Sequence, residues 1–166
     1  MKRLGCFDGR LLLGYPDCAR VWCPATGRGL FKGQCAQFCG AEHALMLLRV
    51  YADTPSDFAA WIRQQQSPAV APQSEAVAEG RKQFEAQACI DCHTVNGTIA
   101  NGRFGPDLTH LMSRETLASG AMPNTPENLT KWIDDPDSFK HGSLMPSMHL
   151  TRAQIDQIAA YLVTLK

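Results

Sequence analysis

Five consecutive residues, Cys89-Ile-Asp-Cys92-His93, constrain the fold of this 166-residue chain more than any other feature. Two thiols at this spacing can each form a thioether with one vinyl group of a haem, and the adjacent imidazole then reaches the iron from the same side. The pattern is typical of covalent c-type haem attachment. The alternative is a thioredoxin-like redox pair with an incidental histidine, which requires alternating strands and helices around the motif.

The sequence around the motif predicts helices instead of that alternation. Ser74 can cap a helix, Thr125 with Pro126 opens another, and Thr151 with Gln154 makes a capping box before a third. Apolar residues of the third helix recur with the helical period, at Ile155, Ile158, Ala159, Leu162 and Leu165. A few short helices with long loops make a thin core, so this pattern favours a haem that fills the centre.

The other face of the iron needs a second axial ligand, which we expect to be a methionine or histidine well downstream. Met145 precedes Pro146, and a loop stiffened by proline can hold a thioether over the iron. We therefore expect Met145 to be the ligand, with Met148 as the next choice. The remaining candidates are Met112, Met122, His110, His141 and His149.

The helical part of the chain resembles the class I cytochrome c family over nearly all of residues 74–166. The matching stretches are CIDCH, FGPDL, LTKWI, LMP and the final amphipathic helix. By this resemblance, the carbonyl of Pro106 accepts the ring N–H of His93, a contact that fixes the tautomer. The resemblance also assigns Arg114 and Trp132 to the haem propionates. The alternatives are a solvated charge for Arg114 and a core aromatic for Trp132.

Two further positions, Gly80 and Phe84, resemble those at which the family's first helix crosses its last. We assign them to helix packing.

A second group of metal-binding side chains lies in the stretch GQCAQFCGAEHALM, which contains Cys35, Cys39, His43 and Met46. Two soft thiolates together with an imidazole and a thioether suit copper. One alternative is a zinc site completed by a further thiol such as Cys23. Another is a pair of structural or oxidised cysteines.

This stretch, continued by FAAWIRQQ, resembles the copper-A segment of cytochrome c oxidase subunit II over about residues 28–66. The ligands that the resemblance implies are the bridging thiolates Cys35 and Cys39, the terminal ligands His43 and Met46, and the backbone carbonyl of Gln37. In the family a strand further upstream supplies a second histidine, but this sequence has no histidine before His43. We therefore expect an incomplete copper-A site, and we interpret the start of the chain as truncated or frameshifted.

The domain organisation follows from a polar, proline-containing segment at residues 64–74, which predicts a flexible linker. It separates a partial β, cupredoxin-like copper-A segment at 28–63 from a mainly α cytochrome c domain at 75–166. Residues 1–27 show neither helical nor strand periodicity, and we expect them to be irregular. Within the first segment, alternation over 46–52 predicts a strand with one face buried.

After that strand, Thr54 and Pro55 mark the start of a helix.

Some subunit II proteins carry a cytochrome c behind the copper domain, and this chain resembles the C-terminal part of such a fusion. The resemblance implies electron transfer from a reduced cytochrome or other donor to haem c, then to copper, then to subunit I of a haem–copper oxidase. We expect no catalytic acid or base in the chain itself. The alternatives are a soluble c-type electron carrier with a vestigial copper segment, and a thiol-redox or zinc protein without haem.

Charge and hydropathy limit the remaining possibilities. Lys and Arg together number 16, as do Asp and Glu, so no overall charge indicates a nucleic-acid partner. No stretch approaches the ~20 apolar residues of a membrane-spanning helix, and the apolar run 11–13 is too short for a signal peptide. By resemblance we expect a periplasmic or other extracytoplasmic location at a bacterial membrane, reached through a missing N-terminal segment or other subunits.

Overall fold

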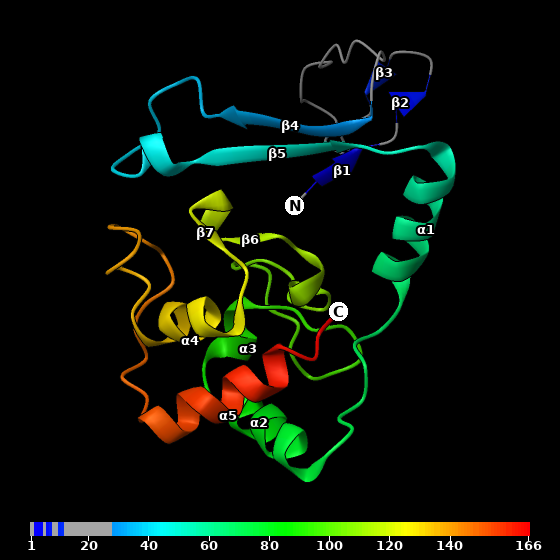
Figure 1. Ribbon diagram of the computed structural model, residues 1–166. Coiled ribbons are helices and arrows are strands. Elements are labelled where there is room, and N and C mark those ends of the chain that lie inside the picture. Colours follow the sequence, from blue (N-terminus) through cyan, green and yellow to red (C-terminus); the bar gives the residue numbers. More distant parts are fainter. Residues whose placement is uncertain (1, 5, 8–9, 12–27) are drawn as a thin grey trace.

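The computed structural model describes residues 2–4, 6–7, 10–11 and 28–166. In Figure 1 two long strands lie at one end of the molecule, a single helix leads away from them, and the remaining helices gather at the other end. The expected order, a short β segment followed by a mainly α domain, is confirmed.

The β segment is a hairpin of β4 (Gly29–Gln34) and β5 (Leu47–Ala52), which pair antiparallel. The two faces of β5 differ as the alternation predicted, since Tyr51 is buried whereas Leu48 is 53% exposed. The loop between the strands, residues 35–46, contains the short turn η1 (His43–Leu45) and is called the thiol loop below. Cys35 N donates to Met46 O at 3.0 Å, so the hairpin brings the two ends of this loop together.

Three short strands precede the hairpin. β1 (Lys2–Leu4) adds to β5 in parallel, while β2 (Cys6–Phe7) and β3 (Arg10–Leu11) pair with each other. The expectation of irregular backbone for residues 1–27 is wrong at these strands, and the rest of that segment lies outside the described residues. The edge of β5 offers a row of backbone N–H and C=O groups that can pair with an extended segment of many sequences. Side-chain periodicity therefore did not indicate the pairing.

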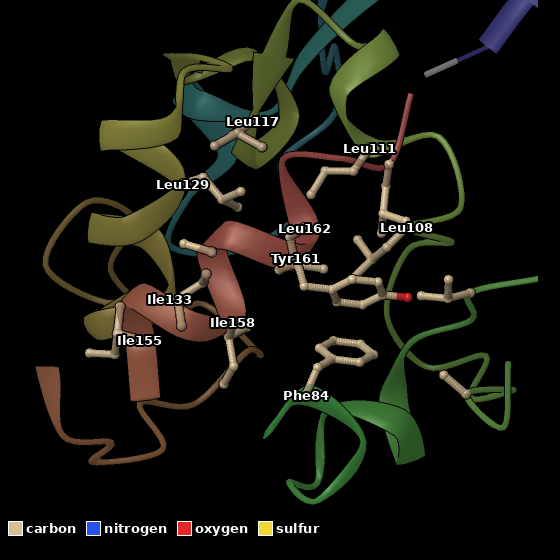
Figure 2. Close-up of a cluster of buried hydrophobic side chains, with 14 of the residues drawn as sticks. Phe84, Leu108, Leu111, Leu117, Leu129, Ile133, Ile155, Ile158, Tyr161 and Leu162 are labelled. Atoms are coloured by element: carbon tan, nitrogen blue, oxygen red, sulfur yellow. The ribbon is translucent and has the colours of Figure 1, made fainter. Parts of the chain in front are cut away.

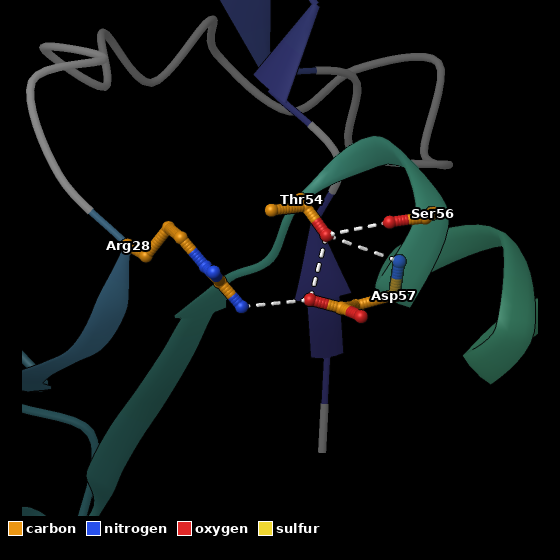
Figure 3. A network of polar contacts seen from close by, with 4 residues as sticks. All are labelled: Arg28, Thr54, Ser56 and Asp57. Atoms are coloured by element: carbon orange, nitrogen blue, oxygen red, sulfur yellow. Dashed lines mark hydrogen bonds and ion pairs between the residues drawn. The ribbon is translucent and has the colours of Figure 1, made fainter.

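Helix α1 (Pro55–Gln66) begins where the sequence predicted. The Thr54 hydroxyl accepts a hydrogen bond from Asp57 N at 3.2 Å and donates to the Asp57 carboxylate at 2.6 Å. Arg28 reaches the same carboxylate at 2.8 Å, as Figure 3 shows. The start of α1 is thereby joined to the residue that precedes β4.

The connection between the two parts differs from the expected linker. Residues 64–66 belong to α1, because glutamine is compatible with a helix and the first helix-breaking residue is Pro68. Beyond the helix, Ala69 N donates to Asn96 O at 2.9 Å, and Ser67 O lies 3.1 Å from His110 Nε2. Backbone groups of the connection therefore bind to the helical domain, whereas the sequence predicted a flexible linker over 64–74.

The helical domain contains α2 (Glu75–Glu85), the single turn α3 (Cys89–Cys92), α4 (Pro126–Asp134) and α5 (Arg152–Leu162). Ser74, Thr125 and Thr151 cap α2, α4 and α5 as predicted, and the capping box with Gln154 is present. Between α3 and α4 lie the short elements η2 (Leu111–Ser113), β6 (Thr116–Leu117), η3 (Ala118–Gly120) and β7 (Met122–Pro123).

The core of this domain is built on the crossing of α2 and α5 (Figure 2). Phe84 and Tyr161 meet with their ring centroids 5.8 Å apart. A Cβ on Gly80 would lie 2.1 Å from the carbonyl oxygen of Gln157, so the helices approach too closely for any side chain there. The packing roles predicted for Gly80 and Phe84 are confirmed. All five apolar residues of the periodic pattern are buried, four of them on α5 and the fifth just beyond its end, namely Ile155, Ile158, Ala159, Leu162 and Leu165.

Candidate functional site

The two thiols of the motif lie on one helical turn. α3 spans Cys89 to Cys92, and residues three apart on a helix share a face. His93 then leaves the helix with an extended backbone, while its N–H still donates to Cys89 O at 2.9 Å. Both thiols are half-buried, and burial raises the pKa of the Cys89 thiol. The motif thus presents two sulfurs and an imidazole from one short, hydrogen-bonded unit.

The His93 ring has a defined orientation. Its Nδ1 lies 2.7 Å from the carbonyl oxygen of Pro106, the contact that the family resemblance implied. In the neutral tautomer that donates this hydrogen bond, Nε2 carries the lone pair that can bind a metal. A Cβ on Gly105 would lie 2.5 Å from Cε1 of His93, so glycine is what allows the backbone to lie against the ring.

A second glycine performs a similar role at the other side of the motif. Gly102 N donates to the carbonyls of Ile90 and His93 at 3.1 Å, and a Cβ there would lie 2.3 Å from Asp91 O. Thr94 also donates to Gly102 O at 2.7 Å. We did not single out Gly102 or Gly105 from the sequence, although both lie between the motif and Pro106, where close backbone approach favours glycine.

The surroundings of the motif suit a large planar apolar group. Phe104 is 73% exposed beside Gly105, and Leu144 is 80% exposed beside Met145. Each is a large apolar side chain next to a predicted site residue. Sulfur and imidazole donors together with such side chains match the chemistry of a haem.

Arg114 and Trp132 occupy different environments. The Arg114 guanidinium donates to the carbonyl of Asp107, and burial lowers the pKa of Arg114 while the charge of Asp107 opposes that shift. A desolvated cation gains from an added anionic group, as the propionate role requires. Trp132 is half-buried and packs against the hydrophobic core, which agrees with its alternative role as a core aromatic.

Met145 and Met148 are both half-buried in the segment between α4 and α5. Ser147 donates to Asp134 O at 2.8 Å, which holds this segment to the end of α4. The choice of Met145 over Met148 as the iron ligand stays a prediction.

The thiol loop brings the predicted copper ligands together. The ligand atoms of Cys35, Cys39 and His43 lie within 4.8 Å of one another. The Met46 sulfur lies 3.7 Å from the sulfur of Cys39, and the Gln37 carbonyl oxygen lies 3.0 Å from the sulfur of Cys35. This donor set fits a soft metal such as copper.

The same loop holds one imidazole. In the part of the chain that the structure describes, the His, Cys, Asp and Glu side chains of this cluster are those of Cys35, Cys39 and His43. A centre of two copper ions with an imidazole on each needs a second imidazole besides that of His43. The pKa of the Cys39 thiol is raised, first by its hydrogen bond with Cys35, and the nearby charge of Lys140 opposes the shift.

The fold and these sites together define a c-type cytochrome domain, a helical electron-transfer module, preceded by a β-hairpin with a thiol-rich loop. The cytochrome c family model matches residues 77–166, and the chain belongs to this family. Within the described ranges, no helix has the length and apolar character needed to cross a membrane.

Similarity to known proteins extends beyond the cytochrome domain. Cytochrome c oxidase subunit 2 of Alkalihalophilus pseudofirmus is 37% identical over 147 residues, which cover 88% of this chain and 42% of that protein. The proteins of the same name from Bacillus sp. (strain PS3) and Bacillus subtilis are 36% and 30% identical, over 83% and 82% of this chain and 40% of each relative. The chain thus spans about two fifths of the length of these relatives.

Proposed function

We propose that residues 75–166 carry one covalent haem c and that the chain passes electrons from this haem towards copper in the thiol loop of the 28–63 segment. The chain would then act in the electron-entry subunit of a haem–copper oxidase. The observation that carries the proposal is the oriented motif: two thiols on one turn, followed by an imidazole whose Nδ1 is held by Pro106. Three relatives named cytochrome c oxidase subunit 2 support the oxidase assignment.

Four residues would hold the haem iron and its attachment points, each with a different role. Cys89 and Cys92 would hold the haem through thioethers, and His93 would bind the iron through Nε2. The hydrogen bond from Nδ1 to Pro106 keeps the ring in place and raises its basicity as a ligand. Met145 would supply the second protein ligand to the iron. When bound, the haem supplies one-electron redox chemistry.

The chain's polar residues hold the rest of the group. Arg114 would offer a desolvated positive charge to a propionate, and Trp132 is the second residue that the family resemblance assigns to this role. On the copper side, Cys35 and Cys39 would offer two thiolates, with His43, Met46 and the Gln37 carbonyl as further donors. The physiological partners are a reduced cytochrome or similar donor and subunit I of the oxidase, at the extracytoplasmic face of the membrane.

The test of haem attachment uses the chain fused to an export signal and expressed with a c-type maturation system. We expect a red protein that retains its haem through acid acetone extraction. Replacing both Cys89 and Cys92 with alanine should abolish this retention, whereas Cys39→Ala, outside the motif, should leave it intact. Extraction of the haem from the unmodified protein by acid acetone would overturn the assignment.

A second candidate function is a soluble electron carrier with a vestigial copper segment. The single imidazole of the thiol loop favours it. The two functions differ in a rapid-mixing experiment, in which the copper-loaded protein is reduced at the haem. Oxidation of the haem with matching reduction of copper supports the oxidase function, and a haem that stays reduced supports the carrier.

A further inference from the structure

A polar cluster joins β5 to the helical domain, away from both the haem motif and the thiol loop. Arg49 and Tyr51 lie on the covered face of β5, and Glu115 immediately precedes β6. Arg49 Nη2 lies 2.5 Å from Glu115 Oε2, and the Tyr51 hydroxyl donates to the same oxygen at 2.7 Å. Arg49 Nε also donates to the Tyr51 oxygen at 3.2 Å, so each of the three side chains contacts the other two.

The environment of this cluster strengthens its hydrogen bonds. The Arg49 side chain is 19% exposed and Tyr51 is 9% exposed, which limits competing water on their side, whereas the Glu115 side chain is 59% exposed. Burial raises the pKa of Tyr51, and hydrogen bonds to Tyr51 and Glu115 raise the pKa of Arg49. The phenol therefore stays neutral and the guanidinium stays charged near neutral pH. Hydrogen bonds with an ionised partner are about twice as strong as neutral ones.

An apolar contact lies beside the cluster. Residues Ala118, Ser119 and Gly120 of η3 all have positive φ, at 51°, 62° and 92°. A Cβ on Gly120 would lie 3.1 Å from the Cβ of Leu47 on β5. Backbone in this conformation persists when surrounding contacts hold it in place. The turn is thus shaped to fit against β5.

A third contact involves the two loops that carry the proposed redox ligands. An ideal Cβ on Gly142 would lie 3.8 Å from the Cβ of Ala41, and the charge of Lys140 acts on the thiol of Cys39. Figure 1 shows the orange segment between α4 and α5 reaching towards the loop between β4 and β5. The segment that contains Met145 therefore lies next to the thiol loop.

We propose that Arg49, Tyr51 and Glu115 form an interdomain lock, which holds the cytochrome domain on β5 at a fixed separation from the thiol loop. The two surfaces that this lock joins both belong to the same chain: β5 with Arg49 and Tyr51, and the helical domain with Glu115. The consequence for electron transfer rests on the proposed function. In the locked form, transfer from haem to copper needs no diffusive encounter between tethered domains.

The test is nitrogen-15 relaxation of the haem-loaded full chain in its ferrous form. Amides of β5 and of α5 should report one common rotational correlation time. Glu115→Gln keeps the shape but removes the charge, and it should lower the ratio of locked to unlocked molecules about tenfold or more. The two parts should then tumble separately and faster. The charge exchange Arg49→Glu with Glu115→Arg should restore much of the common tumbling.

Asp156→Asn provides the matched control, because it removes an exposed ion pair with Arg152 on α5 and should leave the tumbling unchanged. Separate tumbling in the unmodified, haem-loaded protein overturns the lock but leaves the haem assignment standing. Common tumbling that survives Glu115→Gln also overturns it. Failure to attach haem instead overturns the proposed function.

A measurement that does not depend on redox chemistry completes the test. In urea unfolding, Tyr51→Phe and Glu115→Gln together should cost less than the sum of the two single changes, because both break the same contact. Tyr51→Phe and Asp156→Asn should be additive. Additivity of the first pair overturns the lock whether or not haem is attached.

Discussion

Gly80→Ala tests the helix crossing on which the cytochrome domain is built. In an exposed helix this change stabilises by up to about 1 kcal/mol, since alanine is the better helix former. At Gly80, however, the new Cβ would lie 2.1 Å from the carbonyl oxygen of Gln157 and 3.0 Å from the Cβ of Tyr161. Because non-bonded heavy atoms prefer about 3.5–4.0 Å, α5 must move away from α2 by about 1 Å or more.

The obstacle is backbone, which cannot rotate aside as the end of a long side chain can. Moving α5 also separates Tyr161 from Phe84, one turn beyond Gly80. Overpacking of this kind costs about 1–3 kcal/mol, and we expect it to exceed the gain in helix propensity. For a domain of this size, each 1 kcal/mol lowers the Tm by about 4–8 °C. The net cost is then up to about 2 kcal/mol, and we therefore expect a Tm lower by up to about 16 °C.

Thermal unfolding of the haem-loaded protein, followed by far-ultraviolet circular dichroism, measures this effect. Ala76→Gly serves as the control, since Ala76 is exposed on the same helix and changes only propensity, by about 1 kcal/mol or less. A Tm for Gly80→Ala equal to or above that of the unmodified protein would refute the crossing at this distance.

Three further predictions concern the ligands and the core. Met145→Ala should remove the sulfur-to-iron charge-transfer band of the ferric protein and lower its reduction potential, because a thioether ligand raises that potential; Met148→Ala should do neither, and the reverse result would make Met148 the ligand. Copper loading should give no delocalised mixed-valence signal in electron paramagnetic resonance, because the thiol loop is one imidazole short of the paired centre; a resolved signal would show that this imidazole is dispensable. Burial raises the pKa of Tyr161 above its ordinary 10.0. Above about pH 10 the tyrosine of the unfolded chain therefore ionises first, and the free energy of unfolding should fall as the pH rises. Tyr161→Phe should weaken that dependence, and an unchanged alkaline profile in denaturant titrations would contradict the assignment.

Features that depend on neighbouring residues could be predicted from the sequence. The caps at Ser74, Thr125 and Thr151 each bind a backbone N–H three residues further on, so the information lies within one turn. The motif at 89–93 is local in the same sense, because its sulfurs and imidazole lie on one short helical turn and the residue after it. The thiol loop also depends on the pairing of β4 with β5, which brings its two ends together. Periodicity likewise identified the buried face of α5.

Contacts between distant residues were decided by the tertiary structure. Alternation over β5 predicted two different faces, but not that Tyr51 would meet Glu115 from the other domain. The pairing of β1 with β5 and the binding of the linker to the helical domain use backbone groups, which every residue type offers. No pattern in the amino-acid sequence marks such contacts, because they depend on which surfaces the rest of the fold brings within hydrogen-bond distance.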